Sequence, residues 1–145
     1  MAASMVNIYS LAMLLSGNRI LLAKRSDKVS FGQGLYDLVG GKVEEGETVL
    51  QALKREVQEE IGLVLEPADC DLVHVLHRKG TDTEFLALCF KVDITRMAQP
   101  TNKEPEKHDE VQFFPLDALP TNILPAHQQI IDCIKKGIKY SEHGW

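Results

Sequence analysis

The chain has 145 residues, a charged fraction of 26% and a formal net charge of −5 at pH 7. This length predicts one domain, residues 1–145, that is large enough to bury a core. The negative charge and the lack of a basic run exclude a general binder of duplex DNA or RNA. Residues 5–15 are apolar but short and lack a basic leader, so we expect neither a signal peptide nor a membrane span.

The three cysteines, Cys70, Cys89 and Cys133, are odd in number and lack a CxxC spacing. All three have apolar neighbours, which predicts buried, reduced thiols. Reduced thiols are typical of a cytoplasmic protein, and we expect that location here.

The first half of the chain begins with two β-prone apolar runs, Val6–Leu15 and Arg19–Lys24, which flank Ser16-Gly17-Asn18. This arrangement predicts a β-hairpin. A polar loop over residues 26–34 follows. Residues 35–39 are expected to form a short strand that enters Gly40-Gly41, where glycine permits a sharp turn and close approach of a ligand to the backbone.

A helix is predicted from Thr48 to Ile61. Thr48 and Gln51 have the spacing of a capping box, and Gly62 is a typical residue to end the helix. The elements expected after it are strands 71–77 and 84–93, a loop 96–109, a strand 110–115, a helix from Pro125 to Ile138, and a loosely held tail 141–145. Strands interleaved with helices predict an α/β fold in which a mixed sheet lies between two helices.

Three glutamates of the predicted helix, Glu56, Glu59 and Glu60, fall within an arc of about 100° around its axis. The apolar stripe of the helix flanks and partly overlaps this arc, whereas a purely solvated acidic face would lie opposite the stripe. Carboxylates crowded at the edge of a buried surface repel one another. The pattern therefore indicates a site for a divalent cation with oxygen ligands.

Residues 41–63 resemble the signature of the Nudix hydrolases, G-x5-E-x7-R-E-U-x-E-E-x-G-U, in which U is a bulky aliphatic residue. Every fixed position of that signature is met. The matching residues are Gly41, Glu47, Arg55, Glu56, Val57, Glu59, Glu60, Gly62 and Leu63.

The resemblance implies an α/β/α Nudix fold and a Mg²⁺- or Mn²⁺-dependent attack of water on a diphosphate linked to another group. In that family the last three glutamates of the motif bind the metals, which here means Glu56, Glu59 and Glu60. The carbonyl of Gly40 or Gly41 is a further expected metal ligand. Such ions neutralise phosphate charge and activate water.

Other roles implied by the resemblance lie around these glutamates. Arg55 and Glu47 are expected to orient them rather than to do chemistry. MutT-like relatives use one more acidic residue after the motif, as a metal ligand or base. Glu110 is the best-placed candidate, and Glu104 and Glu106 are weaker ones; the alternative for Glu110 is an ordinary loop carboxylate.

Two residues outside the motif are candidates for substrate binding. Arg25 is similar to a basic residue that meets substrate phosphate in some relatives, although it could be an ordinary surface arginine. Asn122 has the setting of an asparagine that reads a purine edge in the MutT type, yet asparagine is also common in turns.

Aromatic residues and histidines give weaker signals. Phe31, Tyr36 and Phe85 could stack on a base, but we expect them to pack in the core. The isolated histidines are expected at the surface rather than in a catalytic site. These are His108, His127 and His143.

The resulting hypothesis is a metal-dependent pyrophosphohydrolase that converts nucleoside or deoxynucleoside triphosphates, as small-molecule substrates, to a monophosphate and pyrophosphate. A monomer or homodimer is expected. The alternatives are a hydrolase of ADP-ribose or another nucleoside diphosphate derivative, and a nucleotide-binding regulator without turnover. An isomerase of isoprenoid diphosphates shares the fold, but Cys70 and Cys89 do not match the catalytic residues it would need.

Overall fold

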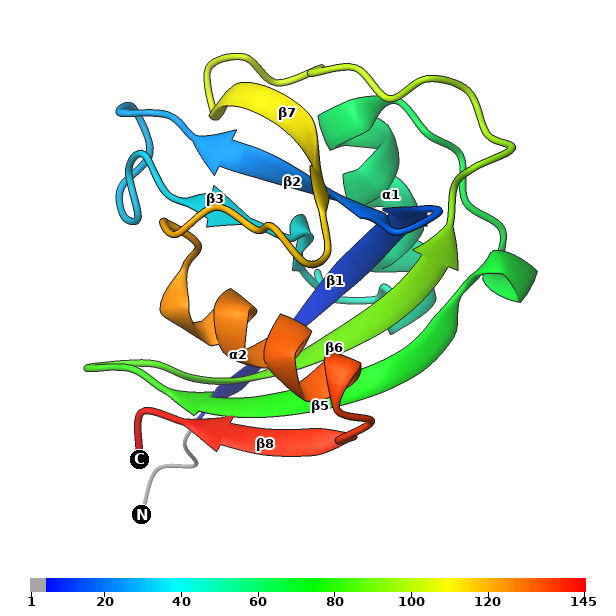
Figure 1. The fold of residues 1–145 in the computed structure, drawn as a ribbon. Helices are drawn as coiled ribbons and strands as arrows, with labels where there is room; N and C mark the ends of the chain where they lie inside the picture. Colours follow the sequence, from blue (N-terminus) through cyan, green and yellow to red (C-terminus); the bar gives the residue numbers. More distant parts are fainter. Residues whose placement is uncertain (1–4) are drawn as a thin grey trace.

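The computed structural model describes residues 5–145, which form a mixed β-sheet and two α-helices (Figure 1). The expectation of an α/β fold with a mixed sheet between helices is confirmed. No helix formed by these residues is long and apolar enough to cross a membrane. In chain order the elements are β1 (Val6–Ser16), β2 (Arg19–Arg25), β3 (Tyr36–Asp37), β4 (Val39–Lys42), α1 (Val49–Ile61), the 3-10 turn η1 (Pro67–Asp69), β5 (Asp71–Lys79), β6 (Glu84–Asp93), β7 (His108–Pro115), α2 (Pro125–Lys135) and β8 (Tyr140–His143).

Strand β1 is the centre of the sheet. It pairs in parallel with β6 along nearly its whole length, and the strand order through it is β3-β2-β1-β6-β5-β8. On its other side β1 pairs with β4 through residues 9–12 and with β2 only at its end. Strand β7 extends the sheet by pairing with β2. The predicted hairpin of β1 and β2 is confirmed, and β1 links both halves of the sheet.

The two faces of β1 carry two separate hydrophobic clusters, because side chains alternate along a strand. Leu11 and Met13 pack in the cluster that contains residues of α2. Ala12 and Leu14 pack in the cluster that contains residues of α1. Figure 1 shows the same arrangement, with α1 and α2 on opposite faces of the sheet.

Helix α1 begins and ends as the sequence predicts. The backbone N–H of Gln51 donates to Thr48 Oγ1, and the backbone N–H of Thr48 donates to Gln51 Oε1, which completes the capping box. Gly62 has a φ of 77°, and its N–H donates to the carbonyl of Gln58. Both ends of the helix that carries the acidic residues are therefore fixed by local contacts.

The single strand expected over residues 35–39 is wrong. The chain instead forms β3 and β4 on either side of Leu38, and β4 contains both Gly40 and Gly41. Strand β3 pairs with β2, whereas β4 pairs with β1. The break at Leu38 thus moves the chain from one strand to the next, and it brings the glycines beside β1.

The C-terminal expectations are also wrong in part. Helix α2 ends at Lys135 rather than at Ile138, since Gly137 takes a φ of 71°. The tail that was expected to be loose forms β8, which pairs in parallel with β5. Its polar sequence conceals this pairing, because β8 is held by backbone bonds to β5 and by side-chain contacts with His74 of β5 and Gln129 of α2.

The cysteines are free among the described residues, as predicted. Cys89 is buried, which confirms that expectation, and burial raises the pKa of its thiol to about 12. Cys70 and Cys133 are only half-buried, so the expectation of full burial is wrong for them.

The buried His74 anchors β8 and provides a test of its role. His74 Nδ1 lies 2.8 Å from the carbonyl of Ile138, so it carries the proton, and Nε2 accepts from the hydroxyl of Ser141 at 2.8 Å. Replacing Ser141→Ala leaves the buried Nε2 without its donor. We expect the free energy of unfolding, measured with urea, to fall by about 1–3 kcal/mol. Glu142→Ala on the same strand is the control, with an expected change below about 0.5 kcal/mol. Equal effects of the two substitutions would contradict this role of Ser141.

Candidate active site

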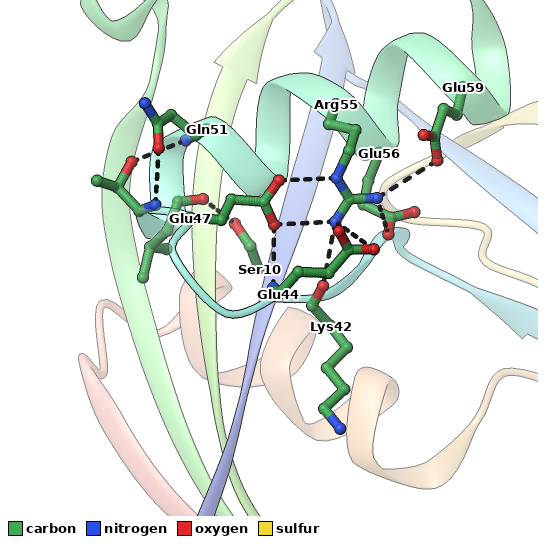
Figure 2. A network of polar contacts seen from close by, with 10 residues as sticks. Ser10, Lys42, Glu44, Glu47, Gln51, Arg55, Glu56 and Glu59 are labelled. Carbon is green, nitrogen blue, oxygen red and sulfur yellow. Dashed lines mark hydrogen bonds and ion pairs between the residues drawn. The ribbon is translucent and has the colours of Figure 1, made fainter.

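Arg55 is the centre of a network of ion pairs at the N-terminal half of α1 (Figure 2). Its guanidinium donates to both carboxylate oxygens of Glu47, with Nε–Oε2 at 2.7 Å and Nη2–Oε1 at 3.0 Å. Nη1 donates to Glu56 Oε1 at 2.8 Å and to Glu59 Oε2 at 3.4 Å, and Nη2 donates to the carbonyl of Lys42 at 3.2 Å. These hydrogen bonds hold the pKa of Glu47 near 2. The geometry supports the orienting role predicted for Arg55 and Glu47.

The two glycines of β4 make room for this network. A Cβ on Gly41 would lie 2.5 Å from Cδ and Oε1 of Glu56, so only glycine lets that carboxylate lie against the loop. A Cβ on Gly40 would lie 2.1 Å from the carbonyl oxygen of Ser10, and Gly40 has a φ of 147°. The backbone itself, rather than a side chain, therefore forms the surface beneath the glutamates.

Glu60 is the most buried member of the acidic group, with 7% of its surface exposed. Burial raises its pKa well above 4.5, and the charges of Asp37, Glu56 and Glu104 raise it further. The N–H of Gly40, which donates to Glu60 Oε2 at 3.3 Å, offsets only part of this effect. The site therefore holds more negative charge than its neighbours neutralise.

Glu104 belongs to this acidic group although it lies outside the motif. Lys107 Nζ binds its Oε2 at 3.1 Å, while Oε1 is buried and has no hydrogen-bond partner in the described part of the chain. The hydrogen bond with Glu104 raises the pKa of Lys107, and the charges of Glu56 and Glu60 raise it further, so this lysine lies near the same carboxylates. A buried carboxylate oxygen without a partner is costly unless a cation or donor binds it.

These residues fit a hard divalent cation in their chemistry, since carboxylate and carbonyl oxygens are its preferred ligands. Within residues 5–145, however, no three acidic, histidine or cysteine side chains converge as a ready-made cluster. Arg55 binds the carboxylates of both Glu56 and Glu59. Glu104 pairs with Lys107 through Oε2 but keeps a buried Oε1 unpaired, and Glu60 forms no ion pair among the residues that the structure describes.

Glu110, the residue first expected to supply the extra carboxylate, lies on β7 and accepts a hydrogen bond from the hydroxyl of Tyr36. Tyr36 is buried in the α2-side cluster and packs edge-on against Phe114, so its expected place in the core is confirmed. The charges that raise the pKa of Glu60 include that of Glu104 but not that of Glu110. We therefore favour Glu104 for this role.

The two predicted substrate-binding residues have different surroundings. Arg25 Nη1 pairs with Asp37 Oδ2 at 2.9 Å, and the guanidinium stacks on Phe31 at 4.8 Å from the ring centre. Burial raises the pKa of Asp37 to about 6, although Arg25 lowers it. The side-chain N–H of Asn122 instead donates to the carbonyl of Gly34 at 2.9 Å. The structure thus gives Asn122 a loop-holding contact, as its turn setting allowed.

Two cavities meet beside this group of charges. The first, of about 500 Å³, is the charged cavity, and its lining includes Glu60, Lys28 and Lys107. The second, of about 350 Å³, is the aromatic cavity, lined in part by Tyr9, Phe31 and Phe85. The two share the following residues in their linings: Arg25, Ser30, Asp37 and Gly40.

Comparison with known proteins identifies the family. The model of the NUDIX domain matches residues 6–134. The chain is a Nudix hydrolase.

Similar proteins include hydrolases of different nucleotides. The chain is 33% identical over 117 residues to the oxidized purine nucleoside triphosphate hydrolase of Mus musculus, a match that covers 78% of this chain and 69% of the relative. It is 31% identical over 122 residues to the NAD-capped RNA hydrolase NudC of Stutzerimonas stutzeri, covering 80% of this chain but 41% of that protein. The crystal structure of a MutT NUDIX hydrolase from Burkholderia pseudomallei superposes with a TM-score of 0.79 at 28% identity, covering 89% of this chain and 98% of that one.

As a Nudix hydrolase, the chain acts on pyrophosphate bonds. Several of its site residues were missed or misplaced from the sequence alone. His108, expected at the surface, is 5% exposed and lies beside Asp37. Phe31 and Phe85, expected in the core, line the aromatic cavity, with Phe31 48% exposed. Lys107, next to His108, carried no signal beyond its place in a polar loop.

The choice between Glu104 and Glu110 can be tested with two matched substitutions in this Nudix hydrolase. We expect Glu104→Gln to lower kcat by at least about a hundredfold, because it removes a carboxylate from the acidic group. Glu110→Gln keeps a hydrogen-bond acceptor for Tyr36 and should change kcat less than about threefold. The measurement is steady-state hydrolysis with Mg²⁺, with thermal unfolding as the check on folding. The reverse order of effects would return the role to Glu110.

Proposed function

We propose that this Nudix hydrolase cleaves nucleoside or deoxynucleoside triphosphates to a monophosphate and pyrophosphate, with Mg²⁺ or Mn²⁺ as cofactor. The observation that carries the proposal is the junction of the two cavities. An aromatic cavity suits a base, and the cavity beside it combines lysines with crowded carboxylates, as a phosphate chain with bound divalent cations requires. The similarity to an oxidized purine nucleoside triphosphate hydrolase over 69% of its length supports the same class of substrate.

The carboxylates would hold the cation. Glu56, Glu59, Glu60 and Glu104 supply charged oxygens, and the carbonyl of Gly40 or Gly41 can supply a neutral one. When bound, a divalent cation neutralises phosphate oxygens and lowers the pKa of a bound water. Burial is the main cause of the raised pKa of Glu60 and repulsion by neighbouring carboxylates adds to it; a cation that pairs with the buried carboxylate offsets both effects.

The cationic side chains of the charged cavity would bind the remaining phosphate charge. Lys28 is exposed at this cavity, Lys107 lies beside the carboxylates, and Arg25 stands where the two cavities join. In the reaction a water oxygen bonds to one phosphorus, the bridging P–O bond breaks, and pyrophosphate leaves with the bonding electrons. A carboxylate of the site accepts the proton from the water. Arg55 and Glu47 keep the glutamates in place.

A nucleotide panel tests the proposal. The purified protein with Mg²⁺ is assayed on deoxynucleoside triphosphates, oxidised purine triphosphates, ADP-ribose and NAD. Phosphate is measured in the presence and absence of inorganic pyrophosphatase, and the nucleoside monophosphate products are separated by anion-exchange chromatography, because cleavage of ADP-ribose or NAD releases no pyrophosphate. We expect phosphate release from triphosphates only when pyrophosphatase is present, since the product is pyrophosphate. Turnover of ADP-ribose or NAD alone would favour the diphosphate-derivative hydrolase, in line with the similarity to NudC. Nucleotide binding without any turnover would favour the regulator.

Glu60→Gln separates a role in cation binding from a role in stability. We expect kcat to fall by at least about a hundredfold. The free energy of unfolding measured without divalent cations should stay equal or rise, because the substitution removes a buried charge that its neighbours repel.

The pH dependence of stability gives a second measurement. Folding raises the pKa of Glu60, so the native carboxyl binds its proton more tightly than the unfolded one. Wild-type stability therefore declines as pH rises above 4.5, and this decline is smaller in the variant.

Thermal unfolding with and without Mg²⁺ completes this test. Mg²⁺ should raise the Tm of the wild type more than that of Glu60→Gln, since a ligand stabilises the state that binds it. Glu45→Gln, a substitution of an exposed glutamate in the preceding loop, is the control and should behave as wild type. An equal Mg²⁺-dependent rise in all three proteins would contradict cation binding by Glu60.

A further inference from the structure

The aromatic cavity has a polar side that the proposed reaction does not use. It lies between the α2-side face of the sheet and the start of α2, and its apolar part contains Tyr9 and Phe85, whose rings are 4.9 Å apart at 50°. Its polar part contains Arg78 of β5 and His127 of α2. Neither residue belongs to the Nudix motif.

Arg78 lies over an aromatic ring and forms no ion pair with the residues that the structure describes. It stands opposite Phe85 in the pairing of β5 with β6, and its Cζ lies 5.2 Å from the centre of that ring. Its Nε is buried and has no hydrogen-bond partner, and no carboxylate within residues 5–145 forms an ion pair with it. Arg78 also lines the aromatic cavity, where the other N–H groups of its guanidinium can donate to an acceptor brought by a ligand.

His127 is a hydrogen-bond donor of fixed orientation. The backbone N–H of Leu38 donates to its Nδ1 at 3.0 Å, so Nδ1 is unprotonated and the neutral ring carries its proton on Nε2. Burial lowers the pKa of His127 to about 3, and the charges of Arg78 and Arg25 lower it further. The ring is therefore neutral at physiological pH. The contact with Leu38 also ties His127 to the junction of β3 and β4.

We propose that Arg78 and the Nε2–H of His127 form a pair of donors that selects purine bases with a carbonyl at position 6, such as guanine and hypoxanthine, over adenine. A carbonyl oxygen accepts from both donors, whereas the amino group of adenine is itself a donor and leaves them unpaired. The other polar groups of the cavity do not favour one base over the other. The hydroxyls of Tyr9 and Ser30 can either donate or accept a hydrogen bond, and the Asp37 carboxylate is already paired with Arg25 where the two cavities join. This inference rests on the proposed nucleotide substrate and specifies its base.

ITP and ATP are matched probes, because the 6-oxo group of one replaces the 6-amino group of the other. We expect the wild-type kcat/KM for ITP to exceed that for ATP by at least about tenfold, the effect of one charge-assisted hydrogen bond. In Arg78→Met, which keeps the length of the side chain without its donors, the ratio should fall to within about threefold of one. A wild-type preference for ATP, or an unchanged ratio in the variant, would overturn the inference.

A second variant and a control address the fold. His127→Asn retains an acceptor for the N–H of Leu38 but removes the Nε2 donor, and it should lower the ITP/ATP ratio at least about threefold. Lys79→Met is the control. Lys79 is the neighbouring cation of β5, but it stacks on Trp145 and does not line the cavity, so this substitution should leave the ITP/ATP ratio unchanged. A ratio that falls equally in Lys79→Met would also overturn the inference. Thermal unfolding identifies any variant that does not fold.

Binding of monophosphates separates this inference from the proposed function. IMP and AMP are titrated into the metal-free protein by calorimetry, so that no hydrolysis is needed. Tighter binding of IMP, lost in Arg78→Met, supports base selection even if no triphosphate is hydrolysed. Hydrolysis of triphosphates combined with equal binding of IMP and AMP would overturn base selection and leave the proposed function intact.

Discussion

The site depends on holding several carboxylates close together where water screens them poorly. Glu60 is buried beside Glu56, Glu104 and Asp37, and their repulsion favours any state in which they separate. The apolar stripe of α1 opposes that separation, because it packs in the same cluster as β1 and anchors the helix. The capping box fixes the start of α1. Packing and capping thus maintain a concentration of charge that is unfavourable until a cation binds.

Arg55 and the glycines of β4 control this charge in different ways. Arg55 neutralises part of it and binds Glu47, Glu56 and Glu59 together, so each carboxylate has a defined direction. Gly40 and Gly41 allow the backbone to lie directly under the carboxylates, where a single added Cβ would collide with Ser10 or Glu56. Arg55 thus fixes the directions of these glutamate side chains, and Gly41 lets the carboxylate of Glu56 lie close to strand β4.

The sequence predicts what depends on local contacts and fails where distant segments meet. The boundaries of α1 and the hairpin follow from neighbouring residues, and they are confirmed. The β8 pairing depends on a histidine of β5, which no local pattern reveals. The choice between Glu104 and Glu110 depends on how the loop before β7 folds over the end of α1, which neither the polar neighbours of Glu104 nor the apolar strand after Glu110 reveals. Their placement is a property of the tertiary structure.

The relation between the two cavities follows from the break at Leu38. Because β3 pairs with β2 and β4 pairs with β1, this one residue separates the Asp37 side of the site from the glycines. Its N–H binds His127 of α2, so the same backbone break also positions a side chain of the aromatic cavity. The aromatic cavity and the cavity that contains Glu60 are therefore linked by this hydrogen bond as well as by the residues that line both of them. A substitution at His127 that lost the bond would leave the N–H of Leu38 without its acceptor at the junction of β3 and β4.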